Sequence, residues 1–335
     1  MNDNIFLTIG IPTFLREKSL KVLLDQISMV KPSKACEILI INNGPIFELD
    51  THITLLMNIG YSVKLIHNKR NCGGQENVLR IYENASGEYT WLLGDDDRLY
   101  DYAIENVISC LNENCCDCLL FNANALDHPS IKLDSGYYNL DFILGGTFPL
   151  RKLMFVPLVI LRTESICKAL HKARLHLGCF TPQLLLIILG DVEKFYYNNI
   201  KIITCEEINI KNGLRLSLLP IFIGIGYLPS IAPNKHIKRK LFNLLISEHS
   251  HYLHPGKVIN SIIAANLQGK PASVCKIARA AFRNYPLWLA ALFQIFLVGY
   301  VMLPLKWCYS AASFLAIKIY KKNINLNDHY SVDRV

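Results

Sequence analysis

The sequence predicts an α/β fold, with a mostly parallel β-sheet flanked by helices and followed by a C-terminal helical region. Its N-terminal part alternates short apolar runs with segments whose apolar residues recur at helical spacing. Repeated strand–helix units form parallel sheets, because each helix carries the chain back to the start of the next strand. From residue 216 onward, long uncharged stretches alternate with basic runs. We therefore expect an α/β domain over residues 1–215 and a helical, membrane-associating region over residues 216–335.

Strands and helices are expected in alternation over the first part of the chain. Short apolar runs predict strands at residues 5–11, 37–41, 62–67, 89–93 and 118–123. Helical spacing predicts helices at residues 18–29, 49–57, 75–85 and 101–113. Later patterns predict a strand at residues 155–161 and helices at residues 163–174 and 183–195. Sheets of this type bind their ligands beyond the carboxyl ends of the strands.

The bulk composition indicates a folded protein with anionic partners. Of the 335 residues, 51% are hydrophobic and 19% are charged, which permits a large core and excludes a disordered chain. The net charge of +8 suits nucleic acid, an anionic membrane or phosphorylated substrates. No motif of basic and aromatic residues supports nucleic-acid binding. The mean hydropathy of +0.24 favours a membrane surface as the partner.

The cysteines are expected to be free thiols. The start of the chain, residues 1–4, lacks the basic residues of a secretion signal, so we expect a reducing compartment for the 11 cysteines. Four of them lie close together, at Cys110, Cys115, Cys116 and Cys118. Their spacing matches no common zinc site, so packing in the core is the favoured explanation.

A long apolar segment lies near the C-terminus, at residues 284–317, and Lys306 is its only charge. It is long enough to cross a bilayer. Basic residues flank it on both sides, however, and a single crossing would place one basic flank outside. We therefore expect membrane contact without a complete crossing. The alternative is a buried helical hairpin.

Three adjacent carboxylates, Asp95, Asp96 and Asp97, follow the predicted strand at residues 89–93. Adjacent carboxylates repel one another unless a cation lies among them. Mg²⁺ or Mn²⁺ prefers carboxylate oxygens together with substrate phosphates, so these residues are candidate metal ligands. The alternative is a helix N-cap formed by Asp97 or Asp101, with the other carboxylates solvated. A cap needs one aspartate rather than three, which favours the metal site.

Polar loops also follow the first three predicted strands. Residues 12–16 offer a hydroxyl, an aromatic ring and a guanidinium, which can contact a nucleoside and a phosphate. Residues 42–45 offer two amides, and residues 68–74 form a basic loop with glycines that can approach a diphosphate. Each loop alone also has an ordinary explanation, as a turn or a helix start. Together they surround the acidic cluster at one edge of the expected sheet.

The order of these motifs resembles glycosyltransferase family 2. The resemblance is carried by residues 7–14 (LTIGIPTF), 38–44 (ILIINNG), 71–74 (NCGG) and 93–97 (LGDDD), and it covers residues 1–125. Within that family the chain is similar to bacterial O-antigen sugar transferases, including abequosyltransferase-like enzymes. The resemblance implies a GT-A fold, a nucleoside-diphosphate sugar donor, a divalent metal and a lipid-linked saccharide acceptor.

The resemblance also implies roles for particular residues. It implies a metal site at Asp95, Asp96 and Asp97, and a donor site lined by Pro12, Thr13, Arg16, Asn42, Asn43, Asn71, Gly73, Asp95 and Asp96. The chain departs from the family at two positions. Asn42 stands where an aspartate is common, and Gly94 stands where many relatives have an aspartate.

An inverting transfer needs a carboxylate that deprotonates the acceptor hydroxyl. Such relatives place this base well after the acidic motif, which indicates Asp191 here, with Glu193 as the second choice. The alternative for Asp191 is a solvated carboxylate on a helix surface. A retaining transfer requires no such base.

The expected function is therefore sugar transfer for O-antigen or another surface polysaccharide, at the cytoplasmic face of the inner membrane. One alternative is a sugar-phosphate nucleotidyltransferase, but residues 12–16 lack the glycines that such enzymes carry after the first strand. A second alternative is a non-catalytic membrane adaptor.

Overall fold

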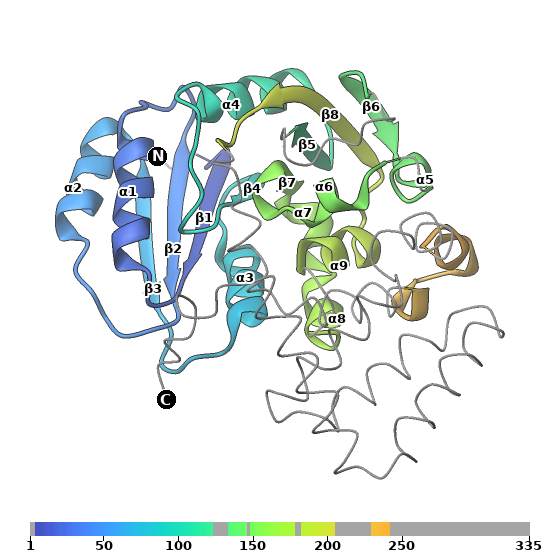
Figure 1. Ribbon diagram of the computed structural model, residues 1–335, viewed down its shortest axis with the longest axis horizontal. Helices are drawn as coiled ribbons and strands as arrows, with labels where there is room; N and C mark the ends of the chain where they lie inside the picture. Colours follow the sequence, from blue (N-terminus) through green and yellow to red (C-terminus); the bar gives the residue numbers. More distant parts are fainter. Residues whose placement is uncertain (1–3, 123–132, 146–147, 178–181, 205–228, 242–335) are drawn as a thin grey trace, which may run out of the picture. The chain divides into compact units, whose positions relative to one another are not determined.

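The computed structural model describes residues 4–122, 133–145, 148–177, 182–204 and 229–241, all within one unit of the chain. These residues form an eight-stranded mixed sheet in the order β3-β2-β1-β4-β7-β5-β8-β6 (Figure 1). The strands are β1 (Leu7–Thr13), β2 (Cys36–Asn42), β3 (Ser62–His67), β4 (Tyr89–Leu92), β5 (Cys118–Asn122), β6 (Gly136–Asn139), β7 (Val159–Arg162) and β8 (Lys194–Lys201). The helices are α1 (Glu17–Ser28), α2 (Asp50–Ile59), α3 (Gly74–Asn84), α4 (Ala103–Glu113), α5 (Leu140–Ile143), α6 (Leu150–Met154), α7 (Thr163–Cys167), α8 (Leu170–Arg174) and α9 (Pro182–Leu189), with a 3-10 turn η2 (Val156–Leu158).

Strands β3, β2, β1 and β4 run parallel, which confirms the predicted strand–helix repeats. β1 pairs with β2 along its whole length, from Leu7 opposite Cys36 to Thr13 opposite Asn42. β3 and β4 are parallel neighbours on either side. The carboxyl ends of all four strands therefore meet at one edge, called here the carboxyl edge, and the opposite edge is called the amino edge.

The remaining strands make the sheet mixed. β7 runs antiparallel to both β4 and β5, β8 runs parallel to β5, and β6 runs antiparallel to β8. The strand predicted at residues 155–161 begins only at Val159, after a 3-10 turn that contains Pro157. Proline has no N–H to donate to a sheet, which explains the later start.

Two predicted helices differ from the observed ones. The helix expected at residues 163–174 is divided into α7 and α8. The helix expected at residues 183–195 ends at Leu189, and β8 begins at Lys194. Val192 and Phe195 continue the helical spacing of the apolar residues, but their backbone lies beyond the helix. β8 instead buries Phe195 and Tyr197, at the spacing of two that a strand requires.

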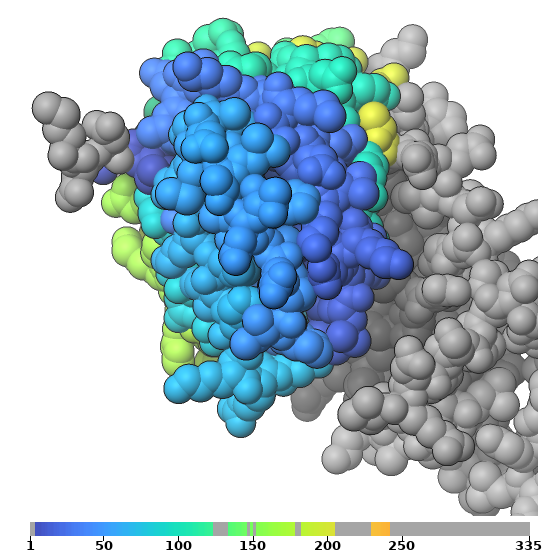
Figure 2. Space-filling model, turned by 90° about the vertical axis from the view of Figure 1, so that its left-hand side faces the viewer, coloured from blue at the N-terminus to red at the C-terminus, as the bar shows by residue number. Residues whose placement is uncertain are grey.

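Helices cover both faces of the sheet. α1, α2 and α4 share one core with one face of β1, and α1 buries Leu20, Leu23, Leu24 and Ile27, as its helical spacing predicts. Figure 2 views the molecule from the side of α1 and α2, where the N-terminal units, in blue, form the surface. α3 lies on the other face of β1, together with α7, α8 and α9 (Figure 1).

A glycine permits the close approach of α3 to β1. A Cβ atom added at Gly10 would lie 2.1 Å from Cγ2 of Ile81, much closer than two carbon atoms can pack. Only a residue without a side chain therefore fits between the strand and the helix. The loop at residues 68–73 runs directly into α3. The packing of α3 on β1 therefore also determines where this loop lies at the carboxyl edge.

The prediction of a membrane-associating region concerns residues 216–335, nearly all of which lie outside the described residues. This includes the apolar segment at residues 284–317. In the ranges that the structure does describe, no helix is both long enough and apolar enough to span a bilayer. The boundary at residue 215 and the membrane association both stay predictions.

Candidate active site

The loops that follow β1, β2, β3 and β4 are held together by backbone hydrogen bonds at the carboxyl edge. Asn43 N donates to Thr13 O (2.9 Å), and Asn68 N donates to Asn42 O (2.9 Å). Leu93 N donates to Gly10 O (2.9 Å), which continues the β1–β4 pairing up to the acidic cluster. The four sequence motifs therefore meet in one place.

Asp95 and Asp96 are joined to the loop after β1. Thr13 Oγ1 donates to Asp95 Oδ2 (2.7 Å). Arg16 Nη1 contacts Asp95 Oδ1 at 3.1 Å and Asp96 Oδ2 at 2.6 Å. Asp95 is 4% exposed, whereas the side chains of Arg16 and Asp96 are 54% and 58% exposed. The structure thus brings four of the predicted site residues together. Asp95 is the buried carboxylate, and Arg16 and Asp96 form an ion pair at the surface.

The charges in this cluster shift one another's pKa values. Burial raises the pKa of Asp95, against the opposing effect of the hydrogen bond from Thr13 and the charge of Arg16. Burial lowers the pKa of Arg16, but the carboxylates of Asp96 and Asp95 outweigh it, so that pKa is raised. Burial, together with the neighbouring carboxylates, raises the pKa of Asp97 to about 7 against the opposing effect of the Gly94 hydrogen bond. The cluster is therefore a site that a cation would stabilise.

Asp97 closes the turn that presents Asp96. Gly94 N donates to Asp97 Oδ2 (2.6 Å), and Asp97 N donates to Gly94 O (3.1 Å). α4 begins later, at Ala103, and no side chain caps it. Neither Asp97 nor Asp101 therefore acts as the helix cap that was the alternative for these carboxylates.

A divalent cation bound here would be held partly by these carboxylates and partly by phosphate and water. It would not be enclosed by protein ligands alone. Among the described residues, no group of three His, Cys, Asp or Glu side chains could hold a metal ion by itself. Mg²⁺ and similar ions commonly take one or two carboxylates and complete their shell with phosphates and water. Asp96 is exposed and Asp95 lies beside it. These two carboxylates are hard oxygen donors of the kind such an ion prefers.

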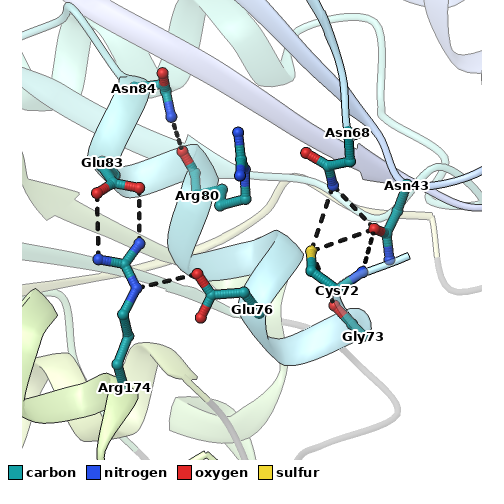
Figure 3. A network of polar contacts seen from close by, with 9 residues as sticks. All are labelled: Asn43, Asn68, Cys72, Gly73, Glu76, Arg80, Glu83, Asn84 and Arg174. Carbon is teal, nitrogen blue, oxygen red and sulfur yellow. Dashed lines mark hydrogen bonds and ion pairs between the residues drawn. The ribbon is translucent and has the colours of Figure 1, made fainter. Parts of the chain in front are cut away.

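Asn43 shapes the loop between β3 and α3 (Figure 3). Its Oδ1 accepts from Cys72 N (2.9 Å), Cys72 Sγ (3.2 Å) and Asn68 Nδ2 (2.9 Å). Its Nδ2 donates to Asn71 Oδ1 (2.8 Å), which also accepts from Gly73 N (2.8 Å). Gly73 has a φ of 86°, which favours glycine at the start of α3. The predicted residues Asn43, Asn71 and Gly73 thus belong to one network.

Asn42 also bonds within the protein. Its side chain is fully buried, and its Nδ2 donates to Pro45 O (2.6 Å) and lies 3.1 Å from His67 Nδ1. Its Oδ1 accepts from Gly44 N (2.9 Å). The amide is therefore occupied by the turn at residues 42–45, which was the ordinary explanation for this motif. Pro12 and Thr13 are the last two residues of β1, which was expected to end at residue 11. A role of Pro12 in the donor site stays a prediction.

Asp191 is not brought to the site. Its N donates to Ser165 O (2.8 Å), and its Oδ2 lies 3.3 Å from Lys168 Nζ, with 70% of the side chain exposed. α7, which carries Ser165, begins at Thr163, whose N donates to Glu88 O directly before β4. Asp191 therefore lies at the amino edge, away from the acidic cluster.

Glu193, the second choice for the base, lies at the same edge. Its N donates to Asp117 Oδ2 (3.1 Å), just before β5 begins. Spacing from the acidic motif could not reveal this, because the end of α9 at Leu189 decides which edge the following residues reach.

Asn77 was not predicted from the sequence, and Asn68 was expected only as part of the loop at residues 68–74. Asn68 Nδ2 donates to Asn77 Oδ1 (2.8 Å), and Asn77 Nδ2 donates to Ile41 O (3.0 Å). Asn77 is 2% exposed, on the face of α3 that also buries Ile81 one turn later. A polar residue on the apolar face of a predicted helix was the available signal, because a buried amide needs a partner.

Comparisons with known proteins agree with this geometry. Residues 8–127 match the family model described as "Glycosyl transferase family 2". Over these residues the chain is similar to family 2 glycosyltransferases, a class of enzyme that uses nucleotide sugars. A search of curated protein sequences gives no significant match.

Solved structures of S. aureus TarS show the same fold. S. aureus TarS 1-349 in complex with UDP-GlcNAc aligns with a TM-score of 0.60 and 15% identity, over 84% of this chain and 82% of that chain. The same protein in complex with UDP aligns with a TM-score of 0.58 and 15% identity, over 84% and 81%. Mannosyltransferase PcManGT from Pyrobaculum calidifontis, in complex with GDP-Man and Mn²⁺, aligns with a TM-score of 0.41 and 12% identity, over 97% and 88%. The likeness to TarS is one of fold, the GT-A fold.

Proposed function

We propose that this protein transfers a sugar from a nucleoside-diphosphate sugar to a hydroxyl group of a saccharide acceptor, with a divalent metal bound at Asp95 and Asp96. The observation that carries this proposal is the contact of Thr13 and Arg16 with the two carboxylates. It joins the loops after β1 and β4 at the carboxyl edge, where sheets of this kind bind ligands. The contact lies inside the residues that match the family 2 model.

The residues of this chain supply binding and orientation. Arg16 uses only Nη1 for the two carboxylates, and its side chain is half exposed, so further N–H donors remain for a phosphate. The Asn43 network fixes the loop at residues 68–73, whose glycine end lets a diphosphate approach the backbone. A Mg²⁺ or Mn²⁺ ion bound beside these groups would offset charge on the departing diphosphate.

We infer that the donor is a UDP-sugar. Support comes from the TarS complexes with UDP-GlcNAc and UDP, which share the fold over most of both chains. Asn42 and Asn43 contribute by shaping the loops around the nucleotide, since their amides bond within the protein.

We further propose a lipid-linked acceptor, used in O-antigen or other surface polysaccharide synthesis at the cytoplasmic face of the inner membrane. Support comes from the sequence resemblance, the net charge of +8 and the apolar segment at residues 284–317. A protein bound to the same membrane as its acceptor meets that acceptor at a high effective concentration.

Calorimetry with UDP, in the presence and absence of Mn²⁺, tests the donor site. We expect metal-dependent binding that weakens by about 10- to 100-fold in Asp96→Asn, because one charged ligand is lost while the shape is kept. Asp101→Asn is the matched control, since Asp101 is an exposed carboxylate five positions further along the same loop. Binding that is independent of metal and equal in both variants would refute the proposed site and favour the adaptor alternative.

Activity is tested by incubating the protein with UDP-GlcNAc and Mn²⁺. A transferase releases UDP, slowly by hydrolysis when no acceptor is present. Consumption of UTP and a sugar phosphate, with release of pyrophosphate, would instead indicate the nucleotidyltransferase alternative. We expect UDP release that is lost in Asp96→Asn and kept in Asp101→Asn.

A further inference from the structure

One arginine connects α8 to both ends of α3 (Figure 3). Arg174 Nε lies 3.0 Å from Glu76 Oε1, near the start of α3. Its Nη1 and Nη2 lie 3.2 Å and 2.7 Å from Glu83 Oε1 and Oε2, near the end of α3. A single guanidinium thus binds two carboxylates that stand seven positions apart on one face of the helix.

Glu76 lies in the first turn of α3, directly after the loop that Asn43 organises. This loop is fixed on one side by Asn43, through Cys72 and Asn71. On its other side it runs into α3, where Arg174 binds Glu76. The position of the loop therefore depends on contacts from both sides.

The contact with Glu83 has the geometry of a strong ion pair. Two parallel N–H donors meet two carboxylate oxygens, an arrangement that lysine cannot reproduce. In the second contact, between Arg174 and Glu76, the side chains are 30% and 22% exposed. Solvent therefore screens the Arg174–Glu76 pair less than a pair on the surface. Glu83 is 47% exposed.

A nearer partner exists for both glutamates but is not used. Arg80 stands four positions after Glu76 on the same helix, the spacing of a local ion pair. In Figure 3 its guanidinium points away from Glu76 and Glu83, and both carboxylates face Arg174 instead. The side chains of α3 are thus arranged to join another element of the fold.

We propose that Arg174 is a positioning residue for the donor site. By holding the first turn of α3, it keeps the loop at residues 71–74 in the place where the diphosphate binds. This inference rests on the proposed function, because it assigns that loop to the donor. Arg174 itself contacts α3 at Glu76 and Glu83, and it acts on the loop through Glu76.

The test compares Arg174→Met with Arg162→Met. Arg162 Nη2 lies 2.6 Å from Glu88, with side-chain exposures of 28% and 48%, close to the 30% and 47% of the Arg174–Glu83 pair. Arg162 lies at the amino edge, beside the first residue of β4. The two variants therefore remove similar ion pairs, and only one of them lies next to the candidate site.

We expect Arg174→Met to raise the KM for UDP-GlcNAc and the Kd for UDP about tenfold, with kcat changed less than about twofold, because a misplaced binding loop weakens donor binding. Arg162→Met should lower the melting temperature but leave both constants unchanged. Arg174→Lys should restore only part of the affinity, since it lacks the two-pronged contact. Amide exchange at residues 71–77 should quicken in Arg174→Met and stay unchanged in Arg162→Met.

Two further results separate the outcomes. Glu83→Gln keeps the Glu76 contact, so it remains informative if Arg174→Met does not fold, and it should raise the KM by a smaller factor. Equal UDP affinity and equal amide exchange in wild type and both Arg174 variants would overturn the role of Arg174 alone. A wild-type protein that binds no UDP in the presence of Mn²⁺ would instead overturn the proposed donor site.

Discussion

Leu15 has a backbone φ of 57°, a left-handed conformation that side chains other than those of asparagine and aspartate rarely adopt. It lies between Thr13 and Arg16, two residues whose contacts with Asp95 fix the loop on either side. With 66% of its surface exposed, Leu15 gains little from burial in return. The strain is therefore held by the neighbouring site contacts.

Leu15→Asn should relieve this strain. We expect the free energy of unfolding to rise by about 0.5–1 kcal/mol, because asparagine tolerates the left-handed region. Urea denaturation, followed by circular dichroism, measures the change. Val22→Asn is the control, because Val22 is 45% exposed in the middle of α1 and asparagine is no better a helix former than valine. A similar gain in both variants would show that replacing any exposed apolar side chain by asparagine has this effect, and that the backbone conformation of Leu15 does not cause it.

At Asn42 the chain departs from the aspartate that is common in the family. The variant Asn42→Asp tests whether this buried position tolerates a carboxylate. Its Nδ2 donates to Pro45 O inside a fully buried site, and a carboxylate there would face that carbonyl without a proton to share. We expect Asn42→Asp to lower the free energy of unfolding by about 2–3 kcal/mol. Asn84→Asp removes a comparable bond to Arg80 O at a partly exposed position and should cost less than about 1 kcal/mol. Equal losses would show that the turn at residues 42–45 tolerates a carboxylate.

At the scale of elements, the contact between β1 and α3 sets the position of the site. Gly10→Ala would place its Cβ 2.1 Å from Ile81 Cγ2, so strand and helix must separate. We expect a loss of about 1–3 kcal/mol, the usual cost of overpacking a core. Ile81→Ala alone should cost about 2–5 kcal/mol. In the double variant the new methyl group occupies part of the vacated space, so the combined loss should be smaller than the sum.

A double-mutant cycle measures this coupling from the unfolding free energies of the four proteins. Additive losses would contradict the close packing of α3 on β1. UDP affinity should fall in Gly10→Ala as well, because α3 carries the loop at residues 71–74 at its start.

The sequence was informative about elements wherever local pattern and final environment agree. The first four strands are short apolar runs, and their parallel order follows from the helices between them, which places four loops at one edge without any knowledge of contacts. β8 was missed because Val192 and Phe195 extend the helical spacing of α9, so pattern alone could not locate the change at Gly190.

The contacts of the site were less accessible to sequence reasoning. Asn43 was expected near a ligand, but its bonds to residues 68–72 depend on a loop 25 to 29 positions away. The pairing of Arg174 with Glu76 spans 98 positions and leaves no local signal. The folded arrangement decides which partner a polar side chain bonds to, and a single sequence gives no sign of that partner.

At the scale of the whole molecule, the rate at which each cysteine is chemically modified measures how often the part of the fold that buries it opens. Burial raises the pKa of Cys36 and Cys116 to about 12 and that of Cys118 well above its usual value, whereas Cys115 and Cys167 are exposed. Because the thiolate is the reactive form, brief treatment of the native protein with iodoacetamide at pH 8 should modify Cys115 and Cys167 and spare the other three. Peptide mass spectrometry identifies the modified sites, and labelling in urea, where all five should react, is the control. Rapid native labelling of Cys118 would contradict its burial.

Cys118 also links the candidate site to the stability of the sheet. It lies in β5 between β7 and β8, so its thiol reacts only when the interior of the sheet opens. A ligand that binds only the folded state lowers the opened population by the factor 1 + [L]/Kd, about 100-fold at a concentration of 100 Kd. UDP with Mn²⁺ should therefore slow the labelling of Cys118 by about that factor in the wild type and far less in Asp96→Asn at the same concentrations. Exposed Cys167 should react at an unchanged rate in every case, because its thiol needs no opening. If Cys118 slowed equally in both proteins, the ligand would be acting at a place other than the acidic cluster.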